Sequence, residues 1–249
     1  MSTRRLLLLS LLAVSLVAPL EAQGRRRSVR FVTTAPVVGG QCHTFGLVPA
    51  GLKASYLSTT PQGNVTFQIT HVSDTPTRTH TTQSVQAPSG NAEAVTILEG
   101  EVLGAIRTLR HVNVKTTATV PVIGQVVTEV DINYVPSLAA GPVDGWCVGA
   151  TWDTAASPSL QTVVTRPPFG PPTTITQNVS SAGVVLAVGD LRTAAGRVFN
   201  TVKYRSTSRV GAGAETSVTW VSMQYNIVVR QETLDAAGNV TSVTELTQL

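Results

Sequence analysis

The stretch HVNVKTTATVPVIGQVVTEVDINYV, residues 111–135, decides the fold class. Both of its halves alternate apolar with polar residues and are rich in valine and threonine, a pattern that predicts β-strands. Proline and glycine between the halves indicate a turn. Residues 105–110, just before this stretch, admit a short helix as an alternative. Strands joined by short turns pair antiparallel, because parallel pairing needs long crossovers.

The rest of the 249-residue chain has the same character. Only 13% of its residues are charged and 42% are hydrophobic, while threonine, valine, serine, alanine and glycine abound. We therefore predict an all-β protein with a curved antiparallel sheet, either half-barrel-like or a sandwich. The stretches AGLKASY (50–56) and VGATWD (148–153) each place a glycine before an aromatic residue and follow a cysteine. This faint echo favours two related β halves.

The N-terminus has the features of a secretory signal peptide. Arg4 and Arg5 precede an apolar run that is shorter than the roughly 20 residues of a membrane-spanning helix. The expected organisation is a signal peptide (1–22), a disordered basic segment (23–28), an N-terminal β half (29–135), a linker (136–145) and a C-terminal β half (146–249). We expect a secreted or periplasmic protein of the cell envelope, with no transmembrane span after signal removal.

The charge distribution argues against a nucleic-acid partner. The formal net charge is +4, and much of it lies in the arginines of residues 25–30. A nucleic-acid surface needs a basic stripe across the fold. Aromatic residues, at 5%, are too scarce for the two girdles of an outer-membrane barrel.

Cys42 and Cys147 are the only two cysteines. Exported proteins meet oxidising conditions, so we predict a disulfide between them. Free, metal-binding or nucleophilic thiols are the alternatives. His43 is the nearest base to Cys42, but neighbours on a strand point to opposite faces. The cysteines and histidines lack the spacing of zinc ligands, so no metal and no cofactor is expected.

The C-terminal part carries a series of turn and strand motifs. They are Ala195-Gly196, Phe199, Val202 to Tyr204, Thr219-Trp220, Tyr225, Ile227 to Glu232 and Glu245-Leu246. In these motifs residues 143–249 resemble uncharacterised exported bacterial β proteins with a domain of unknown function, some likened to the half-barrels of lipoprotein carriers. The resemblance implies a curved antiparallel sheet in the cell envelope and no catalytic residue. Asn226 stands where the pattern usually has glycine, and one extra residue separates Gly196 from Phe199.

No catalytic motif occurs in the chain. The serine-hydrolase elbow, the H-E-x-x-H motif, the phosphate loop and the dinucleotide fingerprint are all missing from the sequence. Glu99 with Glu101 fits a solvated turn pair. His71, Asp74 and His80 flank one turn and fit exposed polar positions in a threonine-rich hairpin, with a metal site as the alternative. We therefore expect no enzyme and assign no catalytic residue.

The leading hypothesis is a non-enzymatic β protein that binds an apolar ligand or a protein partner of the envelope. A sheet rich in hydrophobic residues, with little helix to cover it, would present an apolar face to such a ligand or partner. One alternative is a structural or adhesion β-sandwich. The other is a hydrolase whose site is assembled from distant residues, in which Asp131, Asp153 or Asp190 would meet a histidine.

Overall fold

A computed structural model describes residues 42–87, 90–103, 106–120, 122–142 and 145–249. The regular structure in these ranges consists of thirteen β-strands. Within them, no helix is long and apolar enough to cross a membrane. The expected signal peptide and basic segment lie outside the described residues.

The strands follow the chain in order, mostly as hairpins. They are β1 (Lys53–Thr60), β2 (Gly63–Asp74), β3 (Arg78–Ala87), β4 (Gly90–Leu103), β5 (Ile106–Val120), β6 (Gly124–Ala139), β7 (Thr151–Asp153), β8 (Ser159–Arg166), β9 (Thr173–Arg192), β10 (Val198–Val210), β11 (Gly213–Ser222), β12 (Val228–Leu234) and β13 (Val240–Gln248).

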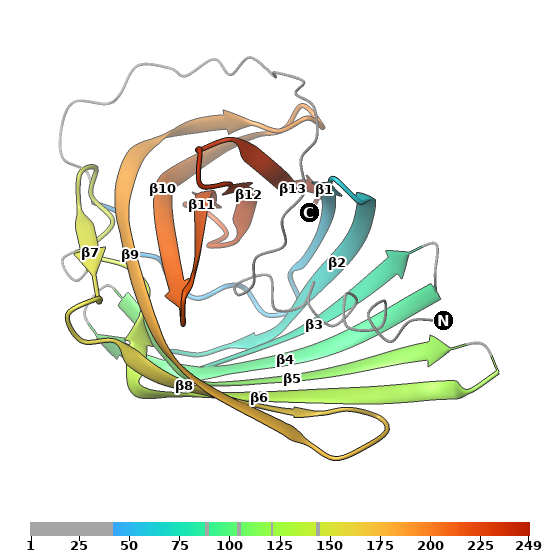
Figure 1. Ribbon diagram of the computed structural model, residues 1–249. Helices are drawn as coiled ribbons and strands as arrows, with labels where there is room; N and C mark the ends of the chain where they lie inside the picture. Colours follow the sequence, from blue (N-terminus) through green and yellow to red (C-terminus); the bar gives the residue numbers. More distant parts are fainter. Residues whose placement is uncertain (1–41, 88–89, 104–105, 121, 143–144) are drawn as a thin grey trace.

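The sheet closes on itself to form an antiparallel barrel of twelve strands (Figure 1). The last strand pairs with the first, with Leu246 of β13 opposite Tyr56 of β1. On the other side of the ring, β9 pairs with β10. The short strand β7 lies beside β9, on the edge that β8 occupies further along. Closure leaves almost every strand with two neighbours, so few backbone donors and acceptors remain unpaired.

The expected all-β fold and curved antiparallel sheet are confirmed, and the curvature continues to full closure. Residues 106–110, where a short helix was the alternative, are strand. β6 runs to Ala139, so the first part of the expected linker is also strand. It is held there by β5, because Thr108 pairs with Ala139 and Leu109 with Leu138 beyond an irregular stretch in which β6 has more residues than β5.

Candidate functional site: the barrel interior

Rows of uncharged side chains line the inside of the barrel. Alternate residues of a strand share a face, so the strand register shows which side chains lie side by side. One row crosses five strands and contains Leu98, Val112, Ile132, Val163 and Ile175. A second row crosses seven strands and contains Leu246, Tyr56, Phe67, Val85, Ala92, Ala118 and Val126.

The buried members show that this face is the inner one. Val112 and Ile132 are buried together with Ala94, Val114 and Tyr134 in one apolar cluster. Residues on the opposite face of the same strands are mostly charged or polar. The register places Lys115 of β5, Glu129 of β6 and Arg166 of β8 in one outer row. Along these rows the barrel wall is therefore uncharged inside and charged outside, and its inner face also carries buried polar side chains such as Ser58, Gln83 and Thr219.

A short polar chain interrupts the apolar lining. The Nε2 of Gln177 donates to the Oε1 of Gln161 at 2.8 Å, and the Nε2 of Gln161 donates to the hydroxyl of Tyr134 at 3.1 Å. Gln161 is only 1% exposed. Burial raises the pKa of Tyr134, and the hydrogen bond from Gln161 opposes this shift. This chain gives the interior a hydrogen-bonding group among apolar neighbours.

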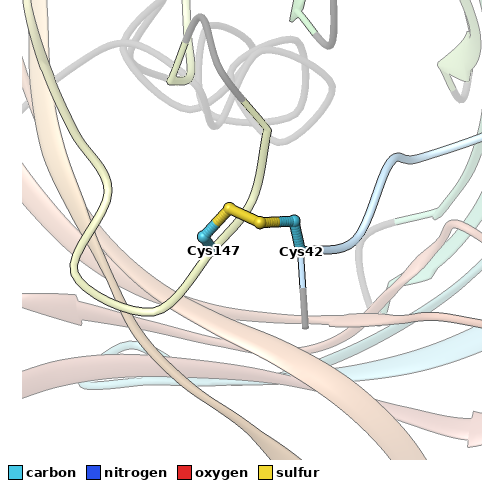
Figure 2. The surroundings of a disulfide bond; sticks show 2 residues. All are labelled: Cys42 and Cys147. Carbon is cyan, nitrogen blue, oxygen red and sulfur yellow. A yellow bond between two sulfur atoms is a disulfide. The ribbon is translucent and has the colours of Figure 1, made fainter. Parts of the chain in front are cut away.

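A disulfide joins the two segments at one end of the barrel. Cys42, in the segment that leads into β1, is bonded to Cys147, in the loop before β7 (Figure 2). The predicted pairing is thus confirmed. Next to it, the backbone N–H of Trp146 donates to the carbonyl of His43 at 3.0 Å. The bond fixes the N-terminal segment to a loop 105 positions away.

Aromatic rings pack beside the disulfide and fill this end of the interior. The ring of Trp146 lies 5.0 Å from Phe45, 4.9 Å from Tyr204 and 5.7 Å from Trp152, measured between centroids. Trp146 and Trp152 are buried with Val185 and Val202 of the barrel wall. The stretch GWCVGATWD, residues 145–153, therefore serves as a structural closure of one barrel end.

A buried cation–π cluster around Trp220 stabilises the C-terminal strands. The ammonium of Lys203 lies 4.7 Å from the ring centroid of Trp220, and the guanidinium of Arg230 lies at 5.9 Å. Arg230 also donates to Glu232 at 2.7 Å and to Glu245 at 3.1 Å. Trp220, Arg230 and Glu245 belong to the C-terminal turn and strand motifs of the sequence, so these motifs have a structural role here.

An ion-pair network on the outer face joins β4, β5, β6 and β8. The Nδ1 of His111 lies 3.3 Å from Glu99, and its Nε2 lies 3.4 Å from Asp131. Asp131 also accepts a hydrogen bond from Asn113 at 2.7 Å and pairs with Arg166. Burial acts to raise the pKa of Asp131, but its hydrogen bonds to these three partners outweigh that effect and lower it.

This network fulfils part of the hydrolase hypothesis, because Asp131 meets a histidine. The two ring nitrogens of His111 lie 3.3 Å and 3.4 Å from the carboxylates of Glu99 and Asp131, so each nitrogen already faces a partner within the protein. A general base needs an unoccupied nitrogen aimed at its substrate. Asp153 instead accepts a hydrogen bond from the backbone N–H of Ala155 at 2.8 Å, and Asp190 is exposed on β9.

The other singled-out residues have structural roles. Asp74 accepts hydrogen bonds from the backbone N–H of Val48 at 2.7 Å and from the hydroxyl of Thr79, so it anchors the segment before β1. Burial lowers the pKa of His71, and the charge of Asp74 opposes this. Burial also lowers the pKa of His43, opposed by its hydrogen bond with Asn226.

Glu99 and Glu101 lie within β4, so the expected position of this pair at a turn is wrong. His80 is opposite Ser73 across the β2–β3 hairpin, and Glu101 is exposed on β4. Within the described ranges, no group of three or more histidine, cysteine or acidic residues is arranged to hold a metal ion. Comparison with family models, curated proteins and solved structures finds no match to this chain.

Proposed function

We propose that the protein is an exported, non-enzymatic β-barrel that binds an apolar molecule in its interior. The observation that carries the proposal is the contrast between the two faces of the wall. The inner rows contain no charged side chain, whereas Lys115, Glu129 and Arg166 form an outer row. An apolar lining attracts an apolar ligand, and a charged outer face suits a barrel that is surrounded by water.

The size of the ring supports an interior ligand. Barrels of about eight strands are just wide enough for their own side chains or one small ligand, and larger barrels enclose cavities. This ring has twelve strands, and small side chains such as Ala92, Ala94 and Thr96 point inward from β4.

The lining also reaches the outside of the barrel at the start of β9. Ile175 is the last member of the inner row that starts at Leu98 of β4. It lies near the start of β9, and it is 58% exposed. The aromatic closure with Trp146 lies at the opposite end of the barrel. We infer that a ligand enters on the side of Ile175. Gln161 and Gln177 would give a ligand with an apolar body one polar contact.

Native mass spectrometry of the purified protein tests this function. We expect a bound apolar species that organic solvent extracts and that returns when the extract is added back. A protein that carries nothing, and that takes up nothing from a total lipid extract, would favour the structural or adhesion role instead.

The His111 network is the basis of a second candidate, a hydrolytic role, which requires that a substrate displace Glu99 or Asp131 from one of the ring nitrogens of His111. Beside it is a surface depression of about 370 Å³ that is lined by Glu99, Arg110, His111, Asn133, Tyr134 and Val135. Chromogenic ester, glycoside and phosphate substrates test it directly. Turnover by the wild type that disappears in both H111Q and D131N would establish this role, and an absence of turnover would remove it.

A further inference from the structure

Two neighbouring hairpins end in exposed apolar side chains. Val122 is 106% exposed, Ile123 is 59% exposed and Phe169 is 69% exposed. Their hairpins, β5–β6 and β8–β9, point to the same end of the barrel, because β6 and β8 are antiparallel neighbours with Glu129 opposite Arg166 (Figure 1). Single exposed apolar residues are common, but these three are gathered at adjacent tips.

The backbone conformation at Val122 is unfavourable for valine, so the stability of the fold does not explain why a valine stands there. Its φ is 75°, in the left-handed region that glycine and asparagine tolerate and that strains a β-branched side chain. Its full exposure means that the side chain gains no packing energy in return. A strained residue without contacts points to a role outside the fold.

The second tip is poor in backbone hydrogen-bond donors. Residues 167–172 read PPFGPP, so four of the six residues are prolines without an N–H group. Only Phe169 and Gly170 carry a donor there. A loop that enters the apolar edge of a bilayer leaves its N–H groups without water, which normally costs free energy. Because residues 167–172 carry only two N–H groups, moving this loop into the edge of a bilayer costs little free energy.

The ends of the two hairpins are uncharged over a defined length of strand. Residues 116–128 and 167–189 contain no charged side chain. The nearest charges, Lys115, Glu129 and Arg166, lie in one row across β5, β6 and β8. Glu129 lies six residues from Ile123, which corresponds to about 20 Å along the strand at about 3.3 Å per residue. The end of these hairpins is therefore uncharged up to a charged row.

We propose that the tips formed by Val122, Ile123 and Phe169 insert into the interfacial region of a lipid bilayer and dock the barrel on a membrane surface. Because the tips are apolar and uncharged, binding depends on burial of these side chains. It therefore extends to neutral phosphatidylcholine and changes little with salt. This docking surface is separate from the inner rows, so it can be tested independently of a ligand.

Co-sedimentation of the full-length mature protein with phosphatidylcholine vesicles tests the proposal. The test variant is V122N/I123S/F169S, in which asparagine also suits the backbone at residue 122. The matched control is L47S/V148S/V198S, whose side chains are 47%, 54% and 51% exposed at the other end of the barrel. Urea unfolding confirms that both variants fold.

We expect the wild type and the control to sediment with the vesicles at both low and high salt. The test variant should lose at least about tenfold in partitioning while its unfolding midpoint stays equal or rises. The proposal is overturned if the wild type stays in solution or if the test variant binds like the wild type. It is also overturned if gel filtration shows that the tips join two copies of the chain instead.

Discussion

The indole of Trp152 lies directly against Gly183 of β9, on the inner face of the barrel, and its Nε1 donates to the hydroxyl of Ser181 at 2.9 Å. On its other side Gly183 faces the backbone carbonyl of Arg205. A β-carbon at residue 183 would overlap with both neighbours. The absence of a side chain thus lets β7 and its tryptophan close on the barrel wall.

Replacing Gly183 with alanine should therefore destabilise the protein. We expect the free energy of unfolding to fall by about 1–3 kcal/mol, because the Trp152 ring and the Arg205 backbone cannot easily move away from the added β-carbon. Gly189 lies on the same strand, and a β-carbon there meets nothing within 4 Å. Urea unfolding of G183A and G189A measures the difference, and equal stability of the two variants would contradict the account.

Reduction of the disulfide should lower stability by about 2–5 kcal/mol, because a loop of about 100 residues loses most of its closure constraint. Titration of the unfolded protein without reductant should find no free thiols. The double variant C42S/C147S should be less stable than the oxidised wild type and insensitive to reductant. Two reactive thiols in unreduced protein would refute the bond between Cys42 and Cys147.

Gln161 should be costly to replace, since it joins Tyr134 and Gln177 inside the barrel. Alanine at this position would leave both partners without their shared hydrogen bonds, at a cost of about 1–3 kcal/mol in addition to the cavity. Leu160 on the outer face, 46% exposed, provides the control. Equal unfolding midpoints for Q161A and L160A would argue against a tightly held polar chain.

Asp131 should contribute stability that acid removes. Its pKa in the folded protein is lowered, because hydrogen bonds with Asn113, Arg166 and His111 outweigh the opposing effect of burial. The contribution is therefore complete above the unfolded-state pKa of about 3.9 and is lost as the pH falls below it towards the folded-state pKa.

Urea unfolding at a series of pH values below about 5 measures this effect. The variant D131N should lose less stability on acidification than the wild type. N113A should raise the pKa of Asp131, which NMR of its carboxyl carbon reports. An identical pH dependence of the wild type and D131N would show that the network adds no stability.

Much of the fold was predictable, because it depends on local patterns. Alternation in residues 111–135 predicted the β5–β6 hairpin, and the presence of only two cysteines in a chain expected to be exported predicted the Cys42–Cys147 bond. Closure of the sheet was not predictable in the same way. It depends on which edges meet, as in the pairing of Tyr56 with Leu246, and period-two alternation carries no information on such distant partners.

The inner and outer faces could have been found in part from the sequence. Pairing residues symmetrically about residue 122 places Asn113 opposite Asp131 and Lys115 opposite Glu129, as the register shows. The contact of His111 with Asp131 was less accessible, because it is diagonal: the register places His111 opposite Asn133 and Asp131 opposite Asn113. The Gln161–Tyr134 contact depends on the pairing of β6 with β8 across the β7 excursion.

The most direct test of an apolar binding interior is a fluorescence titration with the neutral probe N-phenyl-1-naphthylamine. Two adjacent residues of β4 give a matched pair, since Thr96 faces inward opposite Val114 and Ile97 faces outward opposite Asn113. We predict saturable binding to the wild type, unchanged binding to I97F and strongly reduced binding to T96F, with all three proteins folded. Absent binding, or equal binding by T96F and I97F, would contradict a ligand-binding interior.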